Sequence, residues 1–197
     1  MTHNTKGVIF MMVSMFGFVV NDTLMKSLFI TYPIIEIIFL RALFCLPLLF
    51  IAMKIKRVKI LNHSRLTWNL MMLRGFAEVM ATITFLYALK HLPLPNVTAI
   101  IQILPLTVTM AAALFLNERV GYRRWTAIII GLIGVIIVIN PGAEGFSSYS
   151  YYAVLSVIFV TMREMVTRKL PPEVPSVLVT FVTIIGVTIM SAVAMPF

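Results

Sequence analysis

Charged residues and cysteine are scarce in this chain of 197 residues. Asp and Glu together number only 7, charged residues of both signs make up 12% of the sequence, and Cys45 is the single cysteine. A lone cysteine excludes an internal disulfide framework. The three histidines, His3, His63 and His91, have no ligand spacing, so no metal site is expected. The sequence also lacks a nucleophile elbow and a phosphate-binding loop, and we therefore predict neither an enzyme nor a cofactor.

Hydrophobic residues dominate what is present. They make up 60% of the sequence, and the mean hydropathy of +1.01 lies well outside the range of soluble proteins. Backbone amides must be paired inside lipid, so a segment of about 20 apolar residues that crosses the bilayer is expected to be a helix. Seven stretches reach this length, near residues 7–28, 33–53, 67–89, 94–116, 123–140, 150–169 and 174–195. We predict an all-α integral membrane protein with seven transmembrane helices.

Lysine and arginine are distributed unequally between the predicted loops. If the amino terminus is cytoplasmic, the inner loops hold nearly all of these residues, including the cluster from Lys54 to Arg65, and the outer loops hold only Lys90. Basic residues favour the cytoplasmic side, which predicts a multi-pass protein of the inner (plasma) membrane with its amino terminus inside. The net charge of +9 then needs no nucleic acid partner. The basic loops are expected to contact the headgroups of the lipid bilayer.

Residues 8–55 return in weakened form as residues 150–197, at an offset of 142 positions. An acid, a base, a proline and a phenylalanine keep their register: Asp22 and Glu164, Lys26 and Arg168, Pro33 and Pro175, Phe39 and Phe181. The unit contains five predicted helices, an odd number, so the second copy would enter the membrane from the opposite face. Inverted repeats of this kind are typical of secondary transporters that work by alternating access. A chance match between two apolar sequences is the alternative.

This register predicts a first repeat over residues 1–142 and an incomplete second repeat over residues 143–197. A whole second copy would end near residue 284, or roughly twice the offset.

Several motifs together resemble EamA-type carriers of the drug/metabolite transporter superfamily. They are Arg41, Arg74-Gly75, the run from Phe85 to Pro105, Leu116-Asn117-Glu118-Arg119, Arg124-Trp125, the segment 131–135 and Asn140-Pro141-Gly142. This resemblance implies ten helices in two inverted halves and the movement of small metabolites across the inner membrane. It implies a small-molecule substrate such as an amino acid, a nucleoside or an S-adenosylmethionine-like compound. The chain departs from the pattern at Asn117 and Thr126, where the family often has glycine.

Ionisable residues within the predicted spans are the candidates for a substrate site, because each costs about 2.5 to 3.5 kcal/mol at the centre of a membrane helix unless it faces a cavity or a partner. Two amide side chains of the spans, Asn21 and Gln102, are added to them. The candidate substrate-binding residues are therefore Asn21, Asp22, Arg41, Arg74, Glu78, Gln102, Arg163 and Glu164. We expect a central cavity between the first, third, fourth and sixth spans.

Glu78 is one turn from Arg74 on the third span, so the two side chains share a face. Glu78 is expected either to line the cavity, where it would hold a cationic group or carry a proton, or to pair with Arg74 and only pack the bundle. Asp22 has the same spacing to Lys26, and Lys26 is expected to snorkel toward the interface. The equivalent pair in the second copy is Glu164 and Arg168.

Arg41 lies near the centre of the second span, where its guanidinium would either clamp a carboxylate or phosphate or pair with Glu36. Pro105 is expected to bend the fourth span beside Gln102. Glu118 is interpreted as part of a cytoplasmic turn with local ion pairs.

Small residues at Ala127 and Gly131 predict close helix contact within one chain or between copies of a homo-oligomer. We interpret the chain as a secondary transporter of a small polar metabolite. The alternative is a truncated, non-transporting membrane subunit or interaction protein.

Overall fold

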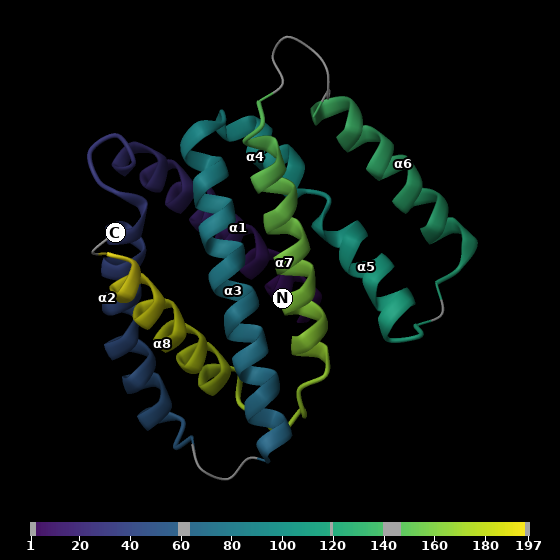
Figure 1. Ribbon diagram of the computed structural model, residues 1–197. Coiled ribbons are helices and arrows are strands. Elements are labelled where there is room, and N and C mark those ends of the chain that lie inside the picture. The colour runs from purple at the N-terminus through teal and green to yellow at the C-terminus, as the bar shows by residue number, and fades with distance from the viewer. Residues whose placement is uncertain (1–2, 59–63, 119, 140–146, 196–197) are drawn as a thin grey trace.

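A computed structural model describes residues 3–58, 64–118, 120–139 and 147–195. Within these residues the chain forms eight helices and no strand (Figure 1). The helices are α1 (His3–Leu28), α2 (Ile34–Ile55), α3 (Arg65–His91), α4 (Leu94–Ile101), α5 (Leu104–Phe115), α6 (Tyr122–Ile139), α7 (Ser150–Arg168) and α8 (Ser176–Ala194). His63, Arg119, Asn140, Pro141, Gly142 and the predicted repeat boundary lie outside the described residues.

Proline marks the starts of several helices, because its missing N–H is tolerated there. Pro33 precedes α2, Pro93 precedes α4 and Pro175 precedes α8. Helix α3 instead begins after Ser64, whose hydroxyl accepts a hydrogen bond from the Thr67 N–H at 3.2 Å. Pro33 and Pro175 are 142 positions apart, so α2 and α8 begin at equivalent positions of the predicted repeat. In Figure 1 these two helices pack side by side and run in opposite directions.

The predicted fourth span is interrupted near its middle. Helix α4 ends at Ile101 and α5 begins at Leu104, with Pro105 in its first turn. The proline cannot donate a backbone hydrogen bond, and the chain is instead held by bonds such as that from the Ile103 N–H to the Ile100 carbonyl at 3.1 Å. The bend predicted at Pro105 is confirmed as a break between two helices.

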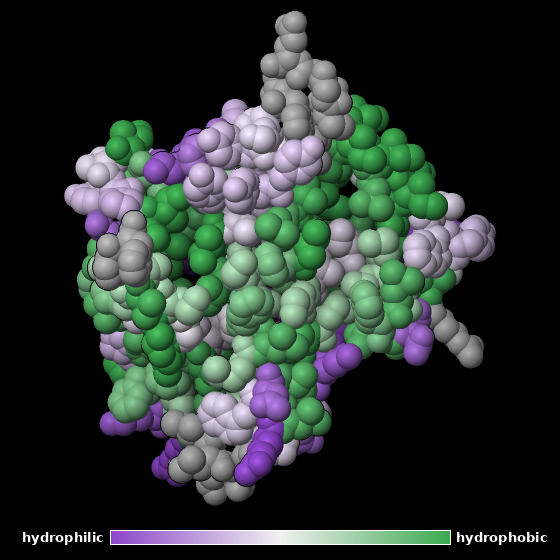
Figure 2. All heavy atoms as spheres, viewed as in Figure 1, coloured by the Kyte–Doolittle hydropathy of each residue, from purple (hydrophilic) through white to green (hydrophobic). Residues whose placement is uncertain are grey.

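Five described segments are long and apolar enough to cross a membrane. They are Gly7–Leu28, Ile34–Ile55, Arg65–His91, Leu94–Phe115 and Ser176–Ala194. Helices α6 and α7 occupy the positions predicted for the other two spans. Figure 2 shows a broad apolar band with strongly hydrophilic side chains gathered along its lower edge. The chain is thus a multi-pass, all-α membrane protein, as its composition predicts.

Helix α3 lies at the centre of the bundle. It packs against α7 and α8, while α5 packs against α7 and α6 against α5 (Figure 1). Helix α1 is almost wholly exposed: among its described side chains only Met25 belongs to the buried core, and Phe29 joins that core just after the helix ends. The ammonium of Lys26, in the last turn of α1, donates to the carbonyl oxygens of Leu89, at 2.9 Å, and Leu92 at the end of α3. Lys26 therefore attaches α1 to the α3–α4 turn.

The surroundings of Gly131 and the backbone conformation of Asn117 explain the residue types found at these two positions. Gly131 of α6 lies so close to α5 that an added Cβ would collide with the Leu106 side chain. This confirms the close helix contact predicted at Gly131. Asn117 has a φ of 53°, in the left-handed region that favours glycine or asparagine, so asparagine can replace the family's glycine there.

Candidate functional site

An ion-pair network joins α3 to α7. The Arg163 guanidinium donates from Nη1 to Glu78 Oε2 at 2.9 Å and from Nη2 to Glu164 Oε1 at 2.6 Å. The side chains of Arg163 and Glu78 are only 25% and 26% exposed. One guanidinium thus compensates two carboxylates in the middle of the bundle. Ion pairs of this kind are strengthened where water is excluded.

Arg74 extends this network to α8. Its Nε donates to Thr167 Oγ1 at 2.9 Å, and its Nη1 donates to Thr183 Oγ1 at 2.8 Å. Each threonine hydroxyl donates its own proton to a backbone carbonyl one turn earlier, so its oxygen is free to accept from Arg74. The Arg74 to Glu78 ion pair, one of the two alternatives for Glu78, is therefore not formed. Glu78 instead pairs across the helix interface, because Arg163 approaches it from α7.

The predicted pairs Asp22 to Lys26 and Glu164 to Arg168 are not formed among the described residues either. Asp22 accepts a hydrogen bond from the Asn21 amide at 3.1 Å, while Lys26 binds the carbonyls at the end of α3. Glu164 pairs with Arg163. Spacing of one helical turn is not sufficient to predict these partners, because Asp22 and Glu164 interact with the adjacent residue and Lys26 with the end of another helix.

Arg41 lines two hollows beside α2. A groove of about 380 Å³ between α1 and α2 is lined in part by Asn21, Glu36 and Arg41. A smaller hollow of about 100 Å³ brings Arg41 near Glu78. Within the described residues Arg41 forms no hydrogen bond or ion pair, so the alternative of a Glu36 partner is not realised. Gln102 lies apart from these groups, exposed at the α4–α5 break.

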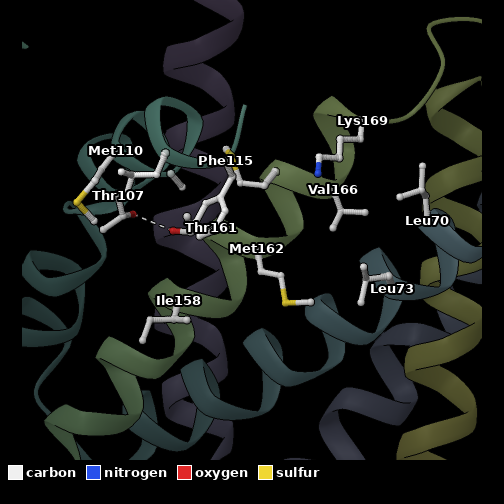
Figure 3. A pocket seen from close by; sticks show the side chains of 13 residues that line it. Leu70, Leu73, Thr107, Met110, Phe115, Ile158, Thr161, Met162, Val166 and Lys169 are labelled. Atoms are coloured by element: carbon white, nitrogen blue, oxygen red, sulfur yellow. Dashed lines mark hydrogen bonds between the residues drawn. The ribbon is translucent and has the colours of Figure 1, made fainter. Parts of the chain in front are cut away.

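A further hollow lies between α3, α5 and α7. Its volume is about 500 Å³, within the usual range for small-molecule sites. Figure 3 shows its walls, which are formed mostly by apolar side chains: Leu70, Leu73, Met110, Ala111, Leu114, Phe115, Ile158, Met162, Met165 and Val166. Thr107, Thr161 and Lys169 are the three polar residues of the lining. This cavity joins three of the four spans between which a central cavity was expected.

Sequence reasoning missed the residues of this cavity. Its candidate residues were all charged or amide side chains of the spans, and none of them lines the hollow. Thr107 and Thr161 meet across it, with their hydroxyl oxygens 2.8 Å apart (Figure 3). Lys169 was interpreted only as an inner-loop charge. A threonine pair on two different spans carries no local signal, so only the packing of α5 against α7 reveals it.

A second ion pair lies beside the cavity. Arg168 Nη1 is 2.8 Å from Glu118 Oε1, which joins the end of α7 to the turn after α5. Their neighbours Phe115 and Lys169 line the hollow. Glu118 thus pairs with a residue 50 positions away. No group of three or more metal ligands occurs within the described part of the chain.

Comparison with known proteins gives one family. The model of the EamA-like transporter family matches residues 5–140. A pseudopaline exporter of Pseudomonas aeruginosa is 28% identical over 167 residues, which are 83% of this chain and 57% of the exporter. No solved structure matches.

Two further relatives align over shorter regions. An S-adenosylmethionine uptake transporter of Rickettsia bellii is 32% identical over 97 residues, or 49% of this chain and 33% of the transporter. A riboflavin transporter of Vibrio cholerae is 30% identical over 127 residues, or 64% of this chain and 42% of the transporter. The chain spans less than two thirds of the length of each of these three relatives.

Proposed function

Because the chain belongs to the EamA-like transporter family of the drug/metabolite transporter superfamily, we propose that it moves a small polar metabolite across the inner membrane by alternating access. The family match over residues 5–140 carries this proposal. The relatives are named for three chemically different molecules, pseudopaline, S-adenosylmethionine and riboflavin. The substrate classes proposed for this chain remain amino acids, nucleosides and S-adenosylmethionine-like compounds.

We further propose that residues 1–142 form one repeat and that α7 and α8 begin a second, inverted one. The equivalent starts of α2 and α8 and their opposite directions support this arrangement. The 500 Å³ cavity would then lie between α3 and α5 of the first repeat and α7 of the second. Movement of one repeat against the other would open this cavity to either side of the membrane in turn.

The ion-pair network crosses the same boundary. Movement of α7 along α3 must break or exchange the bond between Arg163 and Glu78 and the bond between Arg74 and Thr167. Glu164 gives Arg163 a second carboxylate, so a switch need not leave that guanidinium without a partner. We propose that Glu78 takes up a proton or a cationic substrate group when Arg163 moves away. Asn21, Asp22, Arg41 and Gln102 are proposed as further contacts along the path.

The test is reconstitution of the purified chain in proteoliposomes. Exchange of radiolabelled S-adenosylmethionine and riboflavin would be followed beside an amino-acid and nucleoside panel, with protein-free liposomes as the control. We expect exchange of at least one compound, and we expect Glu78→Gln to reduce proton-driven uptake more than it reduces equilibrium exchange. Absence of any exchange, together with stable capture of a membrane protein partner, would instead favour the alternative of a non-transporting subunit.

A further inference from the structure

Among the described residues, Lys169 is the single charged group that lines the cavity between α3, α5 and α7. Lys169 is exposed at one end, and Figure 3 shows its ammonium turned toward the space between α5 and α7. Its neighbour Arg168 is already paired with Glu118, whereas Lys169 forms no ion pair within the described residues. No acidic side chain among the described residues lines the hollow beside it. An exposed ammonium at one end of an apolar hollow favours a ligand that carries one negative charge.

The apolar walls of the cavity determine which kind of molecular framework the ligand can have. Ten of the thirteen lining residues are apolar, and three of them, Met110, Met162 and Met165, have flexible and polarisable side chains. Methionine adapts to different apolar shapes and makes favourable contacts with aromatic rings. Phe115 adds an aromatic surface to the same wall. Such a lining favours an apolar or aromatic body over a sugar or a peptide.

The threonine pair adds one polar requirement. Thr161 donates its hydroxyl proton to the Val157 carbonyl at 2.8 Å. Thr107 is left to donate either to Thr161, at 2.8 Å, or to the Leu104 carbonyl, at 3.1 Å. A hydroxyl has one proton and two lone pairs, so both protons are used inside the protein and only lone pairs face the cavity. A ligand group at this position must therefore donate a hydrogen bond.

The positions of the two polar features set the length of the ligand. Thr161 and Lys169 are eight residues apart, about two turns and roughly 12 Å along the helix axis. The flexible stem of Lys169 can shorten this separation. The negative group and the donor would therefore lie toward opposite ends of an elongated molecule.

Resting on the proposed transport function, we infer that this cavity binds an amphipathic organic anion with one negative group at Lys169, an apolar or aromatic body, and an N–H or O–H group at the Thr107–Thr161 pair. The proposal names the chemistry of the ligand at the site from which transport would occur. It narrows a generally polar metabolite to one that has a negative group and a hydrogen-bond donor on either side of an apolar body.

The test uses radiolabelled indole-3-butyrate. Its carboxylate ends an alkyl chain attached to C3 of the indole ring, and its N–H lies on the other side of that ring. Binding would be measured by equilibrium dialysis on the purified chain in nanodiscs of zwitterionic lipid, with empty nanodiscs subtracted. We expect the uncharged indole-3-butyramide and the cationic tryptamine to bind at least about tenfold more weakly than the carboxylate. Lys169→Gln should weaken carboxylate binding by about tenfold, and Lys169→Arg should retain it. Lys90→Gln, at the outer end of α3, is the matched control and should leave binding unchanged.

A second comparison tests the donor. The wild-type protein should prefer indole-3-butyrate to its 1-methyl derivative, which has no N–H, and Thr107→Val should remove that preference without removing the preference for the anion. Because this compares two ligands on each protein, a general loss of folding cannot imitate it.

Several outcomes would overturn the inference. One is equal binding of anion, amide and amine, and another is unchanged carboxylate binding in Lys169→Gln. Binding that empty nanodiscs reproduce would assign the hollow to lipid acyl chains. Failure of the ligand class is distinguishable from failure of the transport proposal: exchange of S-adenosylmethionine or riboflavin in proteoliposomes, without specific binding of indole-3-butyrate, would leave the carrier standing and reject only the anion.

Discussion

Arg163 of α7 lies 2.9 Å from Glu78 of α3 and 2.6 Å from Glu164 of its own helix, so one guanidinium serves two carboxylates. The two acids are not equivalent. Glu78 is 26% exposed and comes from another helix, whereas Glu164 is 39% exposed and adjacent in the chain. Removal of the arginine takes the ion-pair partner from both acids, whereas removal of Glu78 leaves the arginine paired with Glu164.

This asymmetry predicts an order of stability. Arg163→Met should lower the free energy of unfolding by about 2 to 3 kcal/mol, the usual cost of an unmatched charge in a membrane helix. Glu78→Gln should cost less, because Glu164 still compensates Arg163. Thermal unfolding in detergent, followed by fluorescence, measures both. A larger loss in Glu78→Gln than in Arg163→Met would contradict the shared-guanidinium arrangement.

Arg74 is predicted to act through its planar, forked guanidinium rather than through charge alone. Its Nε and Nη1 reach hydroxyls on two different helices. The ammonium of lysine is a point charge that cannot reproduce this geometry, so Arg74→Lys should destabilise the bundle by about 1 to 2 kcal/mol. A double-mutant cycle with Thr183→Val provides the check. Strictly additive effects would show that Arg74 and Thr183 do not interact.

The sequence predicts the parts of this arrangement that depend on local chemistry. Helix starts follow Pro33, Pro93 and Pro175 because the proline ring restricts the backbone wherever the helix packs. The break beside Pro105 has the same origin. The thickness of the bilayer sets the length of each apolar span, so the spans can also be recognised in the sequence.

The partners of the charged side chains could not be predicted in this way. Spacing placed Glu78 beside Arg74, but tertiary packing brings Arg163 to Glu78 from 85 positions away. Lys26 hydrogen bonds to carbonyl oxygens at the end of α3, a partner more than 60 positions away that local spacing does not predict. The cavity depends on which faces of α5 and α7 meet. That information lies in side-chain packing and not in periodicity.

Lys26 and Arg168, which are equivalent in the repeat, should differ in their contributions to stability. Lys26 hydrogen bonds to the nearly fully buried Leu89 and Leu92, so Lys26→Met should cost about 1.5 to 3 kcal/mol. Arg168 and Glu118 are 42% and 51% exposed, so Arg168→Met should cost less than about 1 kcal/mol. Unfolding measurements on the two variants side by side test the difference. Equal losses would show that Lys26 is no better anchored than a surface charge.

Topology can be tested with single cysteines in a Cys45→Ser background. Lys56 follows α2 and Ser148 precedes α7, and both side chains are exposed. If the amino terminus is cytoplasmic, a membrane-impermeant thiol reagent should label Ser148→Cys in intact cells and label Lys56→Cys only after permeabilisation. The reverse pattern would invert the orientation drawn from the basic loops.

The contact between α5 and α6 depends on the absence of a side chain at Gly131. An added methyl group would displace Leu106, whereas a methyl group at Gly134 would meet nothing within 4 Å. Gly131→Ala should therefore destabilise the bundle by about 1 to 3 kcal/mol, the usual cost of overpacking. Gly134→Ala, the matched control on the same helix, should be neutral or slightly stabilising because alanine favours the helix. Leu106→Ala should partly restore the stability of Gly131→Ala by vacating the contested space. Equal stabilities of the two glycine variants, without any such rescue, would show that α6 does not approach α5 at Gly131.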